Sequence, residues 1–549
     1  MSTSAADCRS RGASSTSAPS DRRAWVPALA IEWLLVMAVF FVEGGAPAPH
    51  VNETHYLAKA KHYWNPDFCP GDAFLDSADP FWVFYATVGA LTRWFSLPAV
   101  AWIGRAAAWS ALAAGWVAVA RAAGLPRGAG ALAAALLVAL VDRGNFAGEW
   151  IVGGVEAKCF AYALVLAELA ALVRGHWNLA WLAGGAASAW HAVVGGWSVA
   201  AVAIVWLTES RATRPSVRAM APALVGGGLL ASLGLAPALL LDRQASPEQR
   251  AEAARIYVYE RLPHHLAPLS LDNAELARRV VRFALLLAAW AALWRQQRRS
   301  VARAPEQAPL SASSDRLFRF AAVAVALAGI GLLIDAANPE RPAAAARWLR
   351  FYWFRLADVA APLAVAVAIA GWTARWLAVP SRGWQWAACL PVVACGWHLM
   401  ARAAERWHAP CPPADRKIER PAEWREACEW VRKHAPADAV GLIDREGQSF
   451  KWHAERGDVA NWKDLPQDAA AVVAWFDRCQ RIWTQRQPDG TTLRTSLAFL
   501  GARRVAETAQ RYGATLVVTR ASPPLALPVA FANDAYAVYR VPRGEEPPP

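Results

Sequence analysis

Eleven long apolar runs divide this chain of 549 residues, and they constrain its fold more than any other feature of the sequence. Residues 24–42 form the first run, which is near the ~20 residues that a helix needs to cross a bilayer. The others cover about residues 98–120, 128–142, 158–174, 177–190, 192–208, 220–240, 279–295, 317–335, 357–377 and 384–401. The run 177–190 is short and interrupted by glycines, which is typical of half of a broken helix. We therefore predict a mostly α-helical fold, a polytopic transmembrane bundle of about eleven spans.

Composition agrees with a membrane protein and excludes other classes. Hydrophobic residues make up 56% of the chain and charged residues 18%, against roughly 25% charged in an ordinary soluble protein. The chain also has 30 Trp, a residue that accumulates where a membrane meets water. Intrinsic disorder, collagen and a small disulfide-rich scaffold are therefore excluded.

The net charge of +13 could indicate a nucleic-acid partner, but the placement of the arginines argues against one. Basic clusters lie in the N-terminal tail and at the ends of later apolar runs. Their members are Arg9, Arg11, Arg22 and Arg23, then Arg211, Arg214 and Arg218, then Arg295, Arg298, Arg299 and Arg303. Under the positive-inside rule these are cytoplasmic segments of a protein in the inner (plasma) membrane. We expect membrane lipids, and no nucleic acid, as partners.

Charge also decides whether the aromatic-rich segment 80–96 spans the membrane. If it did, every later arginine cluster would lie outside, whereas an interfacial helix leaves all of them inside. We therefore predict an interfacial helix here, a disordered cytoplasmic tail over 1–23 and a transmembrane domain over 24–402. The long loops then face outward, as does the region 403–549. These loops are 43–97, 242–277 and 336–356, and their size indicates that binding or chemistry happens on the outer side.

The region 403–549 has the pattern of a small α/β domain. Apolar residues recur at helical spacing over 421–436, beginning at a proline, and two more helices are predicted over 468–483 and 502–513. Residues 439–443 and 514–519 are short apolar runs typical of buried strands. PVAFA and YAVYRV flank Asn533-Asp534, which predicts a hairpin near the end of the chain.

The motif NETHYLAKA follows directly on the first apolar run and resembles the opening of the first outer loop in the GT-C class of membrane glycosyltransferases. There an acidic pair is often followed by x-His/Arg-Phe/Tyr. The resemblance implies a GT-C-like fold and transfer of a sugar from a polyprenyl-phosphate donor on the outer face. It also implies that Glu53, beside His55, is the general base or holds the acceptor. Asn52 stands at the first acidic position and cannot take a proton, so the carboxylate would have to come from Glu53.

Longer strings resemble a second group, an uncharacterised family of bacterial membrane proteins. They are GEWIVGGVEAKCFAY, YVYERLPHHLAPL, RFYWFRLADV and FKWHAERGDVANWKDLPQ. The C-terminal part of that family is a domain of unknown function. This resemblance covers most of the chain and implies no activity.

Candidates for phosphate binding lie in the outer loops. Arg261, His264 and His265 precede a predicted helix, and GT-C enzymes hold the phosphate of a polyprenyl-linked sugar at this depth. Arginine contacts phosphate through two parallel hydrogen bonds. Arg350 and Arg355 have the same potential. All of these side chains could instead extend to lipid headgroups from the interface.

Ionisable residues also occur at membrane depth. Glu156 and Lys158 interrupt two apolar runs, beside Gly153 and Gly154, and charges at this depth usually line a cavity or pair with one another. We expect either a substrate-binding pair or a structural ion pair. In the C-terminal region, a basic and aromatic patch could contact sugars or an anionic headgroup, or pack within its domain. Its members are Lys451, Trp452, His453, Arg456, Trp462 and Lys463.

A divalent cation is a weaker possibility. Asp72, Asp76 and Asp79 would share a face if they stood on a helix, and three carboxylates could then hold such an ion. Gly71 and Pro80 break the segment, which favours a solvated acidic turn instead.

Three functions fit these patterns. The first is a membrane glycosyltransferase with Glu53 as base and Arg261, His264 and His265 on the donor phosphate. The second is a lipid or solute transporter, for which the chain lacks a visible inverted repeat. The third is a non-catalytic scaffold derived from a GT-C enzyme, which Asn52 would favour.

Overall fold

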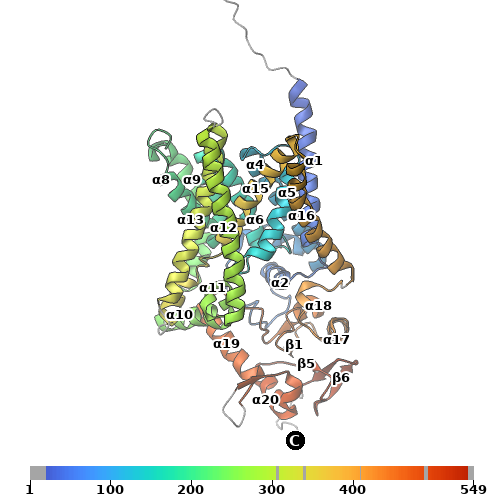
Figure 1. Cartoon of the computed structure of the whole chain (residues 1–549). Helices are drawn as coiled ribbons and strands as arrows, with labels where there is room; N and C mark the ends of the chain where they lie inside the picture. The colour runs from blue at the N-terminus through green and yellow to red at the C-terminus, as the bar shows by residue number, and fades with distance from the viewer. Residues whose placement is uncertain (1–19, 304–307, 338–341, 409, 487–491, 542–549) are drawn as a thin grey trace, which may run out of the picture.

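Eleven helices of a computed structural model match the eleven apolar runs, which confirms a mostly helical fold. The structure describes residues 20–303, 308–337, 342–408, 410–486 and 492–541. The helices are α1 (Ser20–Gly44), α4 (Leu97–Ala122), α5 (Ala129–Gly144), α6 (Ala157–Arg174), α7 (Trp177–Trp190), α8 (Ala192–Leu207), α9 (Val217–Leu240), α12 (Asn273–Arg303), α13 (Ala308–Ala336), α15 (Ala357–Ala378) and α16 (Arg382–His408). In Figure 1 they stand side by side as one bundle.

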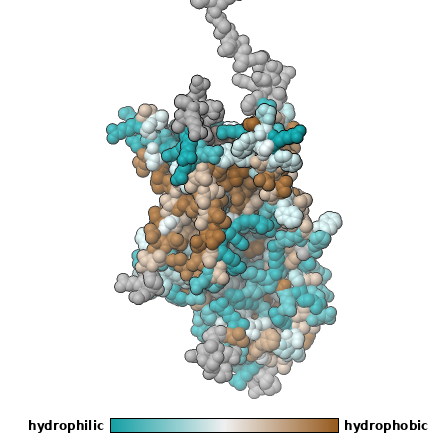
Figure 2. All heavy atoms as spheres, in the orientation of Figure 1, coloured by the Kyte–Doolittle hydropathy of each residue, from teal (hydrophilic) through white to brown (hydrophobic). Residues whose placement is uncertain are grey.

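Six of these helices are long and apolar enough to cross a membrane: α1, α4, α9, α13, α15 and α16. On the face that Figure 2 shows, apolar residues cover the bundle between a polar rim at one end and a polar domain at the other. The chain is therefore a multi-pass membrane protein. Eleven spans, and the side of the membrane that each end faces, stay predictions.

Helix ends differ from the apolar runs in three places. Helix α1 begins at Ser20, inside the predicted tail 1–23, and residues 1–19 of that tail lie outside the described part of the chain. Helices α12 and α13 also extend beyond their apolar runs. The part of α12 after residue 295 is rich in Arg and Gln, which favour helix, so a polar arm continues this helix after its apolar run has ended.

Small residues let the central helices approach closely. A Cβ atom on Gly115 of α4 would lie 2.8 Å from the Cβ of Leu166 on α6, and one on Gly185 of α7 would lie 2.2 Å from the backbone oxygen of Gly227 on α9. Packing of this kind holds helices together in lipid, where the hydrophobic effect adds little between them. Helices α7 and α8 meet at His191, whose Nδ1 accepts a hydrogen bond from the Val194 N–H at 3.4 Å.

The segment 80–96 forms two short helical pieces, α3 (Trp82–Ala86) and the 3₁₀ helix η1 (Gly89–Arg93). Each has five residues, far fewer than the ~20 needed to cross a bilayer. Before them, the NETHYLAKA motif forms α2 (Glu53–Trp64), which packs on η1.

The C-terminal part is a small α/β domain, as predicted. Its sheet has the order β2-β1-β5-β7-β6, parallel between β2, β1 and β5 and antiparallel over β5, β7 and β6. The strands are β1 (Val440–Ile443), β2 (Gly457–Asp458), β5 (Leu516–Arg520), β6 (Val529–Ala532) and β7 (Tyr536–Arg540), and the helices are α17 (Pro421–His434), α18 (Phe450–Ala454), α19 (Ala469–Trp483) and α20 (Ala502–Arg511). The two-residue β2 and the small sheet of β3 (Thr484–Arg486) and β4 (Thr492–Arg494) were not predicted, because they are too short to show a period.

Long connections of the bundle gather against this domain. Helix α10 (Pro247–Arg255) packs on α19 and on α14 (Pro342–Leu349), and α2 packs on α18. The π-helical turn η2 (Ile256–Arg261) and helix α11 (Pro263–Leu266) continue from α10. Figure 1 shows the start of α1 at the opposite end of the bundle from the C-terminal domain. The described parts of the loops 43–97, 242–277 and 336–356 thus share one end of the molecule.

A topology experiment tests which side this end faces. We expect alkaline phosphatase, which is active only outside the cytoplasm, to be inactive when fused after residue 125 and active when fused after residue 410. The reason is that 125 and 410 lie at opposite ends of the bundle and the arginine clusters assign the first end to the cytoplasm. Activity at residue 125 would contradict the predicted orientation.

Candidate functional site

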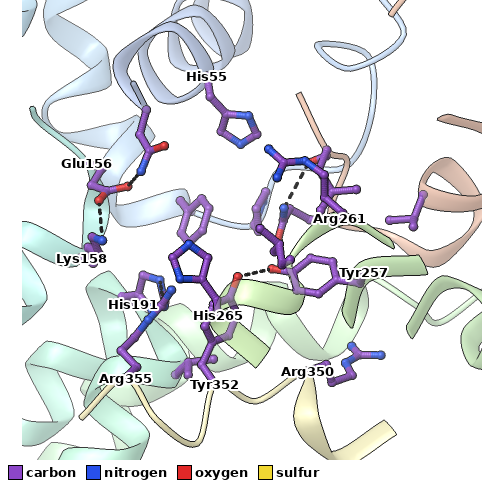
Figure 3. Close-up of a pocket in the computed structure, with 18 of the residues that line it drawn as sticks. His55, Glu156, Lys158, His191, Tyr257, Arg261, His265, Arg350, Tyr352 and Arg355 are labelled. Carbon is purple, nitrogen blue, oxygen red and sulfur yellow. Dashed lines mark hydrogen bonds and ion pairs between the residues drawn. The ribbon is translucent and has the colours of Figure 1, made fainter. Parts of the chain in front are cut away.

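A cavity of about 1480 Å³ lies where the bundle, its connections and the C-terminal domain meet. Its wall combines segments that are far apart in the sequence. They are residues 51–56, 80–81, 149–158, 189–200, 234–265, 350–355, 413–417, 445–448, 462–472 and Arg494, each contributing some of its residues. Only the folded chain brings them together, and Figure 3 shows side chains from several of them directed at the same space.

One wall of the cavity is apolar and belongs to the bundle. Val193 and Trp197 of α8 face it, together with Leu235, Ala238 and Leu239 at the end of α9. The same stretch of α9 is open on the molecular surface, where Leu239 is 78% exposed. Since α9 is long and apolar enough to span a membrane, this wall adjoins the lipid phase.

The rest of the wall carries a surplus of positive charge. Eleven Arg and Lys line the cavity against five Asp and Glu. The basic residues are Lys158, Arg243, Arg250, Arg261, Arg350, Arg355, Arg416, Lys417, Arg445, Lys463 and Arg494, and the acidic ones are Glu149, Glu156, Asp242, Glu260 and Glu446. A cavity lined by one sign of charge concentrates ligands of the other sign. The chemistry of this site is therefore that of an anion-binding site beside an apolar surface.

Glu156 and Lys158 form part of a compact ion-pair cluster on the bundle side. Lys158 Nζ lies 2.6 Å from Glu149 Oε1 and 3.1 Å from Glu156 Oε1. Arg355 Nε lies 2.5 Å from Glu149 Oε2, and its Nη1 is 3.3 Å from His191 Nε2. Two cations thus face two carboxylates, so the cationic surplus of the cavity comes from its other walls.

A hydrogen-bonded chain leads from this cluster to the C-terminal domain. The Asn52 amide donates to Glu156 Oε2 at 2.8 Å, and Lys463 Nζ donates to Asn52 Oδ1 at 2.5 Å. Burial, followed by the positive charge of Arg261, lowers the pKa of Lys463 to about 7. A lysine of that pKa exists partly as a free amine near neutral pH and can accept a proton.

Glu53 does not reach the cavity. Both carboxylate oxygens are engaged with Arg105, since Nε lies 2.6 Å from Oε1 and Nη2 lies 2.6 Å from Oε2. The backbone N–H groups of Val155 and His50 donate to the same oxygens at 2.9 and 2.7 Å. Glu53 and Arg105 are fully buried, so the geometry makes this pair an anchor of the first loop. The expectation that Glu53 faces a substrate is corrected here, because all four lone-pair positions of the carboxylate are taken.

His55 lines the cavity and is held by the C-terminal domain. Its Nδ1 lies 3.3 Å from Asp464 Oδ1, and Asp464 in turn pairs with the buried Lys451 at 2.8 Å. Burial lowers the pKa of His55, which keeps the ring neutral near pH 7. Lys451 of the predicted basic patch is therefore interior and does not face the cavity.

Arg261, His264 and His265 all line the cavity, as Figure 3 shows for Arg261 and His265. Arg261 Nε donates to the Trp462 carbonyl oxygen at 2.8 Å, and His265 Nδ1 contacts the Ala147 carbonyl oxygen. Burial lowers the pKa of His264 to about 4 and that of His265 well below its usual value. Both histidines are therefore neutral hydrogen-bonding groups near pH 7, and Arg261 alone carries the positive charge of this segment.

Arg350 lies where the apolar wall ends. Its Nη2 is 3.2 Å from Asp242 Oδ2, just after α9, and Asp242 Oδ1 accepts from the Ala469 N–H at the start of α19 at 2.8 Å. The Tyr257 and Tyr352 hydroxyls lie 2.9 Å apart nearby (Figure 3). The unpredicted Arg243 lines the same part of the cavity.

The three loop aspartates are not brought together, because residues 66–81 form turns and not a helix. Asp72 pairs with Lys451 at 2.9 Å, Asp76 with His62 at 3.2 Å and Asp79 with Lys59 at 3.5 Å. Across the described residues, no three His, Cys, Asp or Glu side chains are arranged to hold a metal ion. The weaker possibility, a shared acidic face, is therefore not formed, and the segment makes turns as Gly71 and Pro80 favoured, although Asp72 is buried.

Several lining residues were not selected from the sequence as ligand-binding candidates. They are Arg243, Arg250, Arg416, Lys417, Arg445 and Arg494. No local pattern separates these residues from ordinary exposed arginines or lysines.

Comparison with known proteins adds a domain match and two similar structures. Residues 422–482 match the family described as "Domain of unknown function (DUF6798)". No curated protein matches the chain. The archaeal oligosaccharyltransferase AglB from Archaeoglobus fulgidus, in complex with an inhibitory peptide and a dolichol-phosphate, is similar at a TM-score of 0.47 and 12% identity, over 92% of this chain and 70% of that chain.

The second structure is ArnT from Cupriavidus metallidurans, bound to undecaprenyl phosphate. It is similar at a TM-score of 0.42 and 14% identity, over 95% of this chain and 99% of that chain. The match over 422–482 agrees with the implied C-terminal domain of unknown function.

Proposed function

We propose that this protein is a membrane glycosyltransferase that takes a sugar from a polyprenyl-phosphate donor. The observation that carries the proposal is the composition of one cavity, in which an apolar wall formed by α8 and α9 adjoins a wall with a surplus of cations. A ligand with a long apolar chain and a phosphate matches both walls at once. The NETHYLAKA motif, which resembles the start of the first outer loop in GT-C enzymes, lies at the same cavity.

The donor phosphate is assigned to the end of α9. Arg243 follows shortly after the end of α9, and Arg350 pairs with Asp242 at the same point of the chain. A lipid chain on the apolar wall would therefore bring its phosphate towards these two arginines. Arg355 and Lys158 are less suited to this role, because the buried Glu149 and Glu156 neutralise them. The pair between Arg350 and Asp242 is longer, at 3.2 Å, and is partly exposed.

The proton acceptor is assigned to Lys463. In the transfer step an acceptor hydroxyl oxygen forms a bond to the anomeric carbon, and the bond from that carbon to the phosphate oxygen breaks. The phosphate leaves with the electron pair, and the hydroxyl proton passes to the neutral amine of Lys463. A base with a pKa of about 7 suits reaction near neutral pH. Asn52 accepts a hydrogen bond from the amine and is itself held by Glu156. An asparagine in place of the acidic residue of the GT-C motif would thus position the base.

Binding of undecaprenyl phosphate to the purified full chain in nanodiscs tests the lipid part of this proposal. We expect the double variant Arg243→Gln/Arg350→Gln to bind about tenfold more weakly or worse, because hydrogen bonds to a charged group are lost. Arg218→Gln, on the exposed opposite end of α9, is the matched control and should bind like the wild type. Equal binding of undecaprenol, which has no phosphate, would contradict the proposal.

The scaffold and the transporter remain the competing functions. A scaffold would bind the lipid without turnover, so transfer of labelled sugar from membrane donor lipid into any acceptor fraction separates it from an enzyme. A transporter would move lipid between leaflets of a vesicle without breaking the bond between sugar and phosphate.

A further inference from the structure

Three arginines surround one indole on the side of the cavity that the C-terminal domain forms. The guanidinium carbon lies 4.1 Å from the centre of the Trp462 ring for Arg445, 5.5 Å for Arg494 and 5.6 Å for Arg261. They come from three separate elements: the loop after β1, strand β4 and the turn η2. We call Arg261, Arg445 and Arg494 with Trp462 the arginine cluster.

The arginine cluster is held in place before any ligand arrives. The backbone N–H of Trp462 donates to the Arg445 carbonyl oxygen at 3.0 Å, and the Trp462 ring centre lies 5.1 Å from that of Trp475. Arg261 is fixed by its bond to the Trp462 carbonyl oxygen. Arginine attracted to an aromatic face keeps its planar fork available for a carboxylate or phosphate.

Negative charge in the cluster is scarce. Arg445 pairs with Glu446, whereas Arg261 and Arg494 form no ion pair among the residues that the structure describes. Burial above all lowers the pKa of Arg261 and of Arg445, and a neighbouring guanidinium of the cluster adds to the decrease in each case. The like charges therefore repel one another, and a bound anion would relieve that repulsion.

One donor lipid does not account for the charge of this cavity. The walls formed by the loops and the C-terminal domain carry eight Arg and Lys, besides the partly neutral Lys463, against three Asp and Glu. Lys158, Arg355, Glu149 and Glu156 are left out because they belong to the neutral bundle-side cluster. A phosphate group brings about one to two negative charges. A second anion would therefore find cations that the donor phosphate does not balance.

We propose that the arginine cluster binds a second substrate, an acidic saccharide that accepts the transferred sugar. Carboxylate or phosphate groups of this acceptor would contact Arg261, Arg445 and Arg494. Aromatic side chains that line the same cavity, among them Tyr257 and Trp462, suit the C–H faces of sugar rings. This assignment rests on the proposed function, since it names the class of acceptor for the same cavity.

The test uses the full chain in nanodiscs of zwitterionic lipid and measures binding by calorimetry. The probes are hexagalacturonate, the neutral maltohexaose and an acidic hexa-aspartate peptide. We expect the wild type to prefer hexagalacturonate, and Arg445→Gln/Arg494→Gln to bind it about tenfold more weakly or worse, because two charge-assisted contacts are lost. Arg503→Gln, an exposed arginine on α20 of the same domain, is the matched control and should leave binding unchanged.

Two further measurements separate this inference from the proposed function and from misfolding. Undecaprenyl phosphate should bind Arg445→Gln/Arg494→Gln as it binds the wild type, and an equal loss for lipid and hexagalacturonate would make the cluster a lipid-phosphate site and overturn the inference. The single variant Arg494→Gln, at an exposed position, carries the test if the double variant does not fold. Equal affinity of the wild type for hexagalacturonate and maltohexaose would also overturn the inference, as would unchanged binding of hexagalacturonate by the folded variant. Preference for hexa-aspartate would show that the acceptor is not a saccharide.

Discussion

Lys463→Gln should lower sugar transfer by about 10²–10⁴-fold, because general-base catalysis typically contributes that much. Glutamine keeps a hydrogen-bond donor near Asn52 but cannot accept the proton of an acceptor hydroxyl. The measurement is transfer of labelled sugar from donor lipid by the purified full chain. Lys433→Gln, on the exposed face of α17 in the same domain, is the matched control and should transfer like the wild type.

The pH profile distinguishes a base from a residue that only supports the fold. Since the pKa of Lys463 is lowered to about 7, its neutral form grows as pH rises, and wild-type transfer should rise through pH 7 and then level off. The free energy of unfolding should also rise with pH. Lys463 has an ordinary lysine pKa of about 10.4 in the unfolded chain, so between pH 7 and that value the unfolded chain binds more protons than the folded protein. Raising the pH through this window therefore stabilises the folded protein. A flat profile in a wild type that transfers sugar would exclude Lys463 as the base.

Arg105→Met should destabilise the protein by about 3–5 kcal/mol, because it leaves the Glu53 carboxylate buried without its counter-charge. We expect little folded protein after extraction, measured by thermal unfolding and by size-exclusion chromatography of the full chain. Arg503→Met, at an exposed position, should behave like the wild type.

The double variant Glu53→Met/Arg105→Met should recover part of the lost stability, since no buried charge is left unpaired. The sequence motif makes a different prediction for this position. If Glu53 were the base, Glu53→Gln would fold normally and lose only turnover. A stable Glu53→Gln protein without transfer would therefore contradict the anchor and restore Glu53 as the catalytic carboxylate.

Local patterns in the sequence account for most of the secondary structure. Apolar runs predicted the eleven bundle helices, and periodicity predicted α17, α19, α20 and the larger strands of the C-terminal domain. These patterns are reliable because each element must bury an apolar face or run, and the residues that form it lie within one local stretch of the sequence. Short elements such as β2 and the β3–β4 pair have no such signal.

Candidate residues were partly predictable for the same reason. Arg261, His264, His265, Glu156, Lys158, Arg350 and Arg355 were selected as charged or polar groups beside apolar runs, and the structure brings all of them to one cavity. Glu53 was selected by its motif and lies outside the cavity. The motif gives the position of the residue in the chain, whereas Arg105, 52 residues away, determines what its carboxylate contacts.

The sequence by itself therefore determined a multi-pass helical bundle with a C-terminal α/β domain and concentrated the candidate residues in the long loops. Tertiary structure alone decided which charges neutralise one another and which remain open to a ligand. Lys463 contacts Asn52 from 411 positions away, and the arginine cluster joins three distant segments around Trp462. Electrostatic interactions depend on distance in space and on burial, and neither quantity is encoded in the local order of residues.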